Sequence, residues 1–135
     1  MTPFLDTNVL VYAALSDDPR CPVAERLLAA GGTISVQVLN EFANVARTKL
    51  KWPWPDIEAM LALVRSRSGR VQQIALSTHE AALAFARDHG VSFYDALIVA
   101  AALESGCDTV LTEDMQHGRK FGGLTIVNPF IESAP

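Results

Sequence analysis

Short apolar runs alternate along the chain with longer stretches in which apolar residues recur every three or four positions. The short runs suit buried strands, and the longer stretches are typical of amphipathic helices. Turn residues separate these segments, as Gly31-Gly32 and Trp52-Pro53-Trp54-Pro55 do. The pattern predicts strands at residues 3–6, 33–36, 71–75, 108–112 and 124–127, and helices at residues 7–15, 23–30, 37–50, from Pro55 onward, 77–89 and 92–105.

Two of the predicted helices begin with a capping box, in which a hydroxyl and an acidic side chain satisfy free backbone N–H groups. The first box is Ser77-Thr78-His79-Glu80, whose helix should stop at Gly90, and the second is Ser92-Phe93-Tyr94-Asp95. Behind the second box, residues 96–103 are apolar on every face, so we expect this helix to be buried on most sides.

Short apolar strands that alternate with helices indicate an α/β fold, with a parallel sheet covered on both faces. The 135 residues fit a single domain, residues 1–135. Cys21 and Cys107 are isolated in the sequence, so we expect two reduced thiols in a cytoplasmic protein. The longest wholly apolar stretch, residues 96–103, is far too short to span a membrane, and the N-terminus lacks the basic start of a signal peptide.

The net charge of −4, from 11 Lys and Arg against 15 Asp and Glu, argues against a protein that coats nucleic acid by bulk charge. Local basic clusters remain compatible with contacts to phosphates. They are Arg47, Lys49 and Lys51; Arg65, Arg67 and Arg70; and Arg119 and Lys120. The first two clusters are equally explained by helix C-termini, where cations complement the helix dipole.

Four acidic residues fall where an open α/β sheet binds ligands, at the carboxyl ends of its strands. Asp6 ends the first predicted strand, Glu41 lies one turn into the helix after the second, Asp95 opens the buried helix, and Asp114 follows the fourth strand. Singly, Asp6 and Asp95 are explained as helix caps and Asp114 as a turn residue. Glu41 lies on an apolar helix stripe, where a carboxylate is costly unless a partner satisfies it.

Several carboxylates that converge at one sheet edge repel each other and raise each other's pKa values. A bound divalent cation offsets this repulsion. Mg²⁺ and Mn²⁺ prefer oxygen ligands, and carboxylate-held Mg²⁺ suits chemistry on phosphate groups. Spacing alone does not show that the four acids meet.

Four motifs of this chain resemble, in order, those of PIN-domain ribonucleases. The first is Phe4-Leu5-Asp6-Thr7-Asn8-Val9-Leu10, and the second is Asn40-Glu41-Phe42. The third runs from Tyr94 to Ala102, and the fourth is Leu111-Thr112-Glu113-Asp114-Met115-Gln116-His117-Gly118. The fourth motif has the form common in VapC toxins of toxin–antitoxin pairs. The resemblance covers nearly the whole chain, and all four acidic positions match.

The resemblance implies a three-layer α/β/α sandwich with a mainly parallel sheet, and a Mg²⁺- or Mn²⁺-dependent endoribonuclease. Asp6 and Asp95 would be the most direct metal ligands, and Asp114 would complete the metal site. Glu41 would bind a second metal or orient the attacking water. Water would attack the phosphodiester in line and leave a 5′-phosphate and a 3′-hydroxyl. The supporting residues implied are Thr7 and Asn8, which would brace Asp6, and Thr112; Glu113 is expected to point outward into solvent.

The same resemblance implies three partners: an RNA substrate, a VapB-type antitoxin whose tail would cover the groove, and a second copy of the chain in a homodimer. Arg119 and Lys120, directly after the fourth motif, are the candidate contacts to RNA phosphates. Trp52 and Trp54 straddle prolines in a loop. We expect them to pack against the core or to meet a partner protein rather than to stack on bases.

Other protein classes fit the sequence less well. A haloacid-dehalogenase-type phosphatase needs a second aspartate two residues after the first, where this chain has Asn8. A response-regulator receiver needs an acidic pair before its central aspartate and a late lysine, neither of which we can place. A PIN-like fold that only binds RNA or protein remains the main alternative, and the loss of one of the four acids would have favoured it.

Overall fold

The computed structural model describes residues 2–131, which form one six-stranded sheet and six helices. Its strands are short, and β1 ends one residue before the first helix begins. The strands are β1 (Phe4–Leu5), β2 (Thr33–Ser35), β3 (Arg70–Gln72), β4 (Thr109–Leu111), β5 (Lys120–Phe121) and β6 (Leu124–Val127). The helices are α1 (Thr7–Ala13), α2 (Cys21–Ala30), α3 (Val36–Thr48), α4 (Trp54–Arg67), α5 (Leu76–His89) and α6 (Phe93–Glu104).

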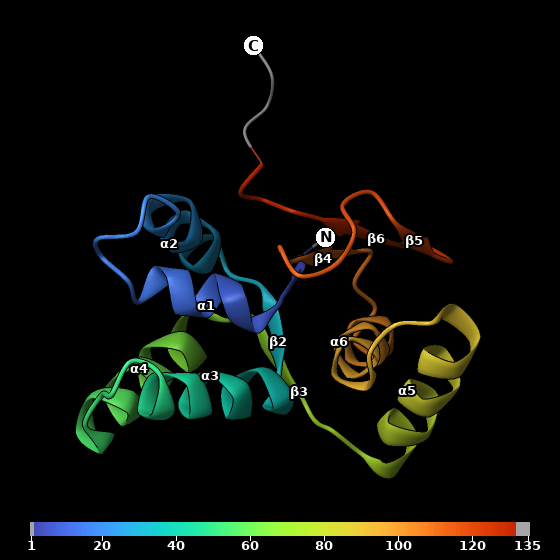
Figure 1. The fold of residues 1–135 in the computed structure, drawn as a ribbon, viewed down its shortest axis with the longest axis horizontal. Helices are drawn as coiled ribbons and strands as arrows, with labels where there is room; N and C mark the ends of the chain where they lie inside the picture. Colours follow the sequence, from blue (N-terminus) through green and yellow to red (C-terminus); the bar gives the residue numbers. More distant parts are fainter. Residues whose placement is uncertain (1, 132–135) are drawn as a thin grey trace.

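The strand order of the sheet is β3-β2-β1-β4-β6-β5, and only the β5–β6 pair is antiparallel. Phe4 of β1 pairs with Thr33 of β2 on one side and with Val110 of β4 on the other. Strands β2 and β3 are added to the sheet on one side of β1, whereas β4 and the later strands lie on the other side. The direction in which strands are added therefore reverses between β1 and β4. Because parallel connections are right-handed, the helices before and after this reversal cover different faces. Figure 1 shows α1–α4 grouped on one side and α5 and α6 together on the other, which confirms the expected α/β sandwich.

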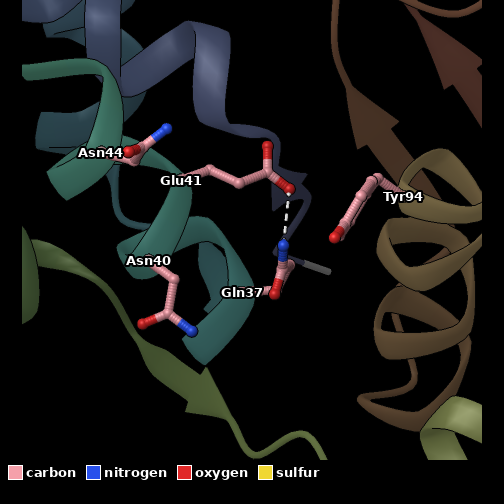
Figure 2. A pocket seen from close by; sticks show the side chains of 5 residues that line it. All are labelled: Gln37, Asn40, Glu41, Asn44 and Tyr94. Carbon is pink, nitrogen blue, oxygen red and sulfur yellow. Dashed lines mark hydrogen bonds between the residues drawn. The ribbon is translucent and has the colours of Figure 1, made fainter. Parts of the chain in front are cut away.

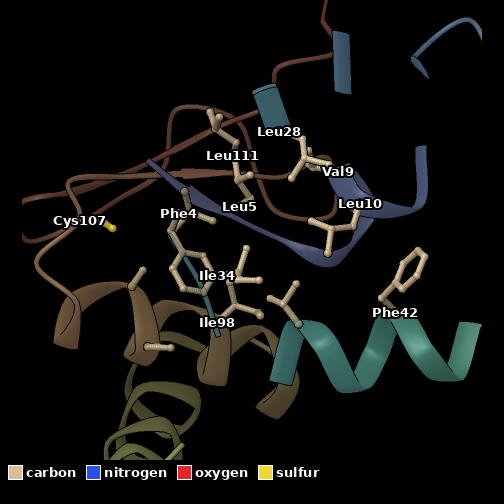
Figure 3. Packing of buried hydrophobic residues seen from close by; sticks show 14 of the residues in the cluster. Phe4, Leu5, Val9, Leu10, Leu28, Ile34, Phe42, Ile98, Cys107 and Leu111 are labelled. Atoms are coloured by element: carbon tan, nitrogen blue, oxygen red, sulfur yellow. The ribbon is translucent and has the colours of Figure 1, made fainter. Parts of the chain in front are cut away.

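The core forms because successive residues of each strand point to opposite faces of the sheet. Figure 3 shows this at β1, where Phe4 points toward Ile98 of α6 and Leu5 points the other way, toward Leu28 of α2. In α6 every residue from Ala96 to Ala102 is buried, as its all-round apolar sequence predicted. None of the helices in residues 2–131 is long and apolar enough to cross a membrane.

The structure differs from the strand prediction in the end of the third strand and in one strand that was missed. The third strand ends at Gln72 rather than at residue 75, because its partner β2 ends at Ser35, where α3 begins, and offers no further backbone to pair with. Strand β5 was not predicted at all. It is a two-residue strand that pairs with β6 across a turn in which Gly122 has a φ of 61°. A segment this short has no periodicity to detect.

The first capping prediction was also displaced. Helix α5 begins at Leu76, so Ser77 lies inside the first turn, and the hydroxyl of Thr78 accepts the Ala75 N–H at 3.1 Å. The second prediction is confirmed for its serine, because the Ser92 hydroxyl accepts the Asp95 N–H at 3.2 Å. Gly90 ends α5 with a φ of 67°, the left-handed conformation that favours glycine.

Candidate functional site

Asp6 occupies the reversal point between β1 and β4, and it is 4% exposed. Its Oδ1 atom accepts the Thr7 N–H at 2.7 Å, and its Oδ2 atom accepts the Thr112 hydroxyl at 2.8 Å. The pKa of Asp6 is raised to about 7, chiefly by burial and to a smaller extent by the nearby charges of Glu41 and Asp114, against the lowering effect of the two hydrogen bonds. Asp6 therefore is the N-cap of α1, as the simpler explanation predicted, and is also a carboxylate held at a strongly raised pKa.

Thr112, directly after β4, joins the acids through its hydroxyl. Besides donating to Asp6, this hydroxyl accepts the Asn8 side-chain amide at 3.0 Å and the Asp114 N–H at 3.1 Å. The Asn8 amide also donates to Asp114 Oδ2 at 3.2 Å. Thr112 thus contacts both Asp6 and Asp114, and Asn8 contacts Asp114. We call the four residues Asp6, Asn8, Thr112 and Asp114 the Thr112 network.

Replacing Thr112 with valine should lower the free energy of unfolding by about 2 kcal/mol, because the substitution removes a buried hydroxyl and leaves its hydrogen-bond partners unsatisfied. Urea unfolding at neutral pH measures the change. Thr125→Val, on β6 and outside the Thr112 network, is the matched control. Equal stability of the two variants would contradict a structural role for this hydroxyl.

Glu41 lies in the middle of α3 and is half-buried. The Thr7 hydroxyl donates to its Oε2 atom at 3.1 Å, and the Gln37 amide donates to its Oε1 atom at 3.1 Å. These two donors explain how a carboxylate is tolerated on the apolar stripe of α3. Thr7 therefore serves two acids, since its N–H caps Asp6 and its hydroxyl contacts Glu41.

Asp95 lies in the first turn of α6 and is half-buried, whereas Asp114 is exposed. Burial raises the pKa of Asp95, and the charge of Asp114 raises it further, although the Ser92 hydrogen bond lowers it. The two acids line one cavity together with Arg119. Hydrogen bonds thus connect Asp6 with Asp114, and Glu41 contacts Thr7 beside them, while Asp95 is coupled to the group through the charge of Asp114.

The donor chemistry of this group suits a hard divalent cation, because all four acids offer oxygen and a cation would relieve the raised pKa of Asp6. As the side chains of residues 2–131 lie, no three His, Cys, Asp or Glu residues are arranged to hold a metal together. This arrangement still fits Mg²⁺, which usually keeps several waters and binds through one or two carboxylates.

Glu113 was expected to point into solvent, and this prediction was wrong. Its carboxylate accepts a hydrogen bond from the Tyr12 hydroxyl and lies 3.3 Å from the Arg20 guanidinium, and its side chain is 23% exposed. Burial and the contact with Glu113 together raise the pKa of Tyr12 to about 12. The sequence does not reveal this site because its three members are brought together by the packing of α1 against the segment after β4.

The predicted basic residues differ in their surroundings. Arg119 lies in the cavity with Asp95 and Asp114, where its guanidinium also donates to the His89 carbonyl at 2.9 Å. Lys120 is exposed at the start of β5. Lys49, for which the sequence favoured a phosphate contact and a helix-end role equally, lines a depression with Glu41, Glu113 and Asp114. Arg47, in the last turn of α3, instead donates to the carbonyl of Trp52 in the following loop at 3.1 Å.

The two tryptophans of the proline-rich loop are in different environments. Trp52 packs edge-on against buried Phe42, with ring centroids 6.1 Å apart, as expected for a residue that contacts the core. Trp54 is 53% exposed, and the Arg47 guanidinium lies over its ring.

Four residues around Glu41 were not proposed as site residues from the sequence. Gln37, Asn40 and Asn44 line a groove with Glu41 on α3, and Tyr94 faces them from α6. The available signal was their spacing, because positions 37, 40, 41 and 44 follow the i, i+3, i+4, i+7 pattern of one helix face. From the sequence alone, polar residues on one helix face indicate only a solvent-exposed surface. The structure adds Tyr94, which lines the groove opposite them.

The fold and the acidic site together define a class of protein, and a family comparison agrees. The family model described as the PIN domain matches residues 4–120, and the chain belongs to this family. No curated protein matches the chain in sequence.

Several solved structures share this fold. VapC20 of Mycobacterium tuberculosis, described as a sarcin–ricin-loop-cleaving toxin, aligns with a TM-score of 0.69 and 23% identity over 84% of this chain and 92% of its own. A toxin–antitoxin complex from Klebsiella pneumoniae gives a TM-score of 0.70 and 19% identity, covering 96% of this chain and 98% of the other. VapBC2 of Rickettsia felis, bound to a promoter DNA fragment, gives a TM-score of 0.66 and 22% identity, covering 93% of this chain and 97% of the other.

Proposed function

We propose that this chain is a VapC-type toxin, a Mg²⁺- or Mn²⁺-dependent endoribonuclease. The observation that carries the proposal is Asp6, a buried carboxylate with a pKa near 7 at the reversal point of a PIN-family sheet, with Glu41 and Asp114 close enough to raise that pKa. Structures of the same fold support it, because one is named as a sarcin–ricin-loop-cleaving toxin, one as a toxin–antitoxin complex and one as VapBC2.

In this proposal Asp6 and Asp95 would hold the metal most directly, Asp114 would complete the metal site, and Glu41 would bind a second metal or orient the attacking water. The bound ion would neutralise charge on the phosphoryl oxygens and supply an activated water. Thr112 and Asn8 fix the directions of the Asp6 and Asp114 carboxylates, and Thr7 fixes Glu41. Cleavage leaves a 5′-phosphate and a 3′-hydroxyl.

Arg119 and Lys120 are proposed to contact phosphates of the RNA beside the scissile bond. Arg119 already lines the cavity of Asp95 and Asp114, so a phosphate bound there would lie between this guanidinium and the acidic site. We further propose that the chain acts in the cytoplasm as a homodimer and is inhibited by a VapB-type antitoxin.

Purified chain should cut total cellular RNA into discrete fragments with 5′-phosphate ends when Mg²⁺ or Mn²⁺ is present. Asp95→Asn should slow this cleavage by roughly a hundredfold, because it removes one of the proposed metal ligands but keeps the side-chain shape. Gel analysis and sequencing of fragment ends measure both. Circular dichroism of the variant checks that it is folded.

The absence of cleavage under either metal would contradict the enzyme and favour a PIN fold that only binds RNA or protein. A phosphatase is not favoured, because residue 8 is an asparagine whose amide is occupied by Thr112 and Asp114.

A further inference from the structure

A groove on α3 contains Glu41, but its other lining residues have no role in the proposed reaction. It has a volume of about 420 Å³ and is lined by Gln37, Asn40, Glu41, Asn44 and Tyr94. Figure 2 shows the first four side chains on one face of α3, with Tyr94 reaching toward them from α6. Tyr94 is 63% exposed, so most of its ring is free to receive another planar group.

Three of the lining residues are carboxamides, and each carries both a donor and an acceptor. The amide nitrogen of Gln37 is engaged with Glu41, whereas Asn40 and Asn44 are both exposed and have no side-chain hydrogen bond to another described residue. The edges of nucleobases present donors and acceptors side by side, which is the pattern that asparagine and glutamine recognise. An aromatic ring beside such amides supplies a stacking surface for the same base.

We propose that this groove binds one unpaired nucleobase of the RNA next to the scissile phosphate and sets the sequence preference of cleavage. Tyr94 stacks on the base, and Asn40 and Asn44 contact its edge. Gln37 also lines the groove, and its side-chain amide donates a hydrogen bond to the Glu41 carboxylate. Gln37 therefore connects the base-binding groove with the reaction site. The inference rests on the proposed function, since it assumes that the chain acts on RNA.

The charge of the groove decides between a base and a phosphate. Its lining residues are neutral except for Glu41, whose negative charge would repel a phosphate. The basic residues near the site, Lys49 and Arg119, lie in the neighbouring cavities, each of which contains Asp114. An RNA strand that crosses Asp114 would therefore place its phosphates near these cations and a flanking base in the carboxamide groove.

The test uses Tyr94→Ala and the double variant Asn40→Ala/Asn44→Ala, with Gln73→Ala as control. Gln73 is an exposed carboxamide after β3, outside the groove. For cleavage of a random-sequence single-stranded RNA pool, Tyr94→Ala should raise KM about tenfold, with a smaller change in kcat. The asparagine double variant should broaden the base preference at one flanking position, as read by sequencing the fragment ends. Tyr94→Phe should retain the wild-type KM.

Binding is measured separately from catalysis in the Asp95→Asn background, by fluorescence anisotropy of a labelled single-stranded RNA of mixed sequence. Tyr94→Ala should raise Kd about tenfold there, and Gln73→Ala should leave it unchanged. Unchanged KM, Kd and cleavage sequence in the groove variants of an active enzyme would overturn the inference and leave the proposed function standing. A wild-type chain that neither cleaves nor binds RNA would overturn both. Loss of a copurifying protein partner without any change in RNA binding would assign the groove to protein and also overturn the inference.

Discussion

Asp6→Asn is expected to abolish RNA cleavage and at the same time to stabilise the metal-free protein. The loss of cleavage should exceed about a thousandfold, because a neutral amide removes the buried charge that would hold the cation, and such electrostatic stabilisation amounts to several kcal/mol. The substituted side chain has the same shape, and its oxygen can still accept the Thr7 N–H that caps α1.

The gain in stability follows from the raised pKa. A shift of the Asp6 pKa from 3.8 to about 7 means that the ionised folded form costs about 4 kcal/mol relative to the unfolded chain above pH 7. Asparagine carries no charge and avoids this cost. The net gain should be smaller, about 2 kcal/mol, because the Thr112 hydroxyl loses a carboxylate acceptor.

Cleavage assays and urea unfolding in EDTA at about pH 8 measure the two effects on the same preparation. Asp17→Asn is the control, since Asp17 is an exposed carboxylate outside the Thr112 network. A variant that loses both activity and stability would show that Asp6 is chiefly a structural residue. A variant that keeps activity would remove Asp6 from the site.

Removal of divalent metal with EDTA should stop cleavage by the wild-type chain, again by more than about a thousandfold, and added Mg²⁺ or Mn²⁺ should restore it. Without a cation, Glu41, Asp95 and Asp114 present only negative charge to a negatively charged phosphodiester. Cleavage that persists in excess EDTA would contradict a metal-dependent reaction.

Metal binding should also reverse the pH dependence of stability that Asp6 contributes. In the metal-free folded chain Asp6 keeps its proton up to about pH 7, whereas the unfolded chain loses it near 3.8. The folded state therefore binds more protons in this window, and the Asp6 contribution to stability falls as the pH rises from about 4 to about 7. Asp95 acts in the same direction.

A divalent cation binds the ionised carboxylates, so its stabilising effect should grow over the same pH range. The difference in Tm between wild type and Asp6→Asn, measured with and without Mg²⁺ at about pH 5 and about pH 8, isolates the contribution of Asp6. A difference that does not depend on pH or on Mg²⁺ would contradict both the raised pKa and the metal site.

The sequence predicted the fold well where hydrophobic pattern and helix caps agree. The buried helix α6 and its Ser92 cap illustrate this, because an all-apolar helix and a capping serine are both local signals. The failures at β3 and β5 have a different origin. The length of β3 is decided by where its neighbour β2 ends, and β5 exists only because β6 lies beside it, so neither depends on local sequence alone.

The candidate site shows the same division. Topology places Asp6 and Asp114 beside each other because β1 and β4 are neighbours in the sheet. The alternation of strands and helices predicted that both acids lie at the carboxyl ends of strands, but it did not predict that these two strands are neighbours. The pairing of Glu113 with Tyr12 and Arg20, and the position of Tyr94 opposite Asn40, depend instead on how helices pack. No local pattern of residues encodes these contacts.

Within the Thr112 network, the two side-chain hydrogen bonds from Asn8 through Thr112 to Asp6 run in one direction. Asn8 donates to Thr112, and Thr112 donates to Asp6, so each dipole presents its positive end to the next acceptor. The Thr112 hydroxyl has a single hydrogen to give, and its two acceptor positions are filled by Asn8 and Asp114. The network is therefore polarised toward Asp6, and this polarity depends on an amide at position 8. An ionised aspartate at position 8 would have no hydrogen to donate to Thr112 or Asp114. The second aspartate of a haloacid-dehalogenase-type phosphatase therefore does not fit this hydrogen-bond network.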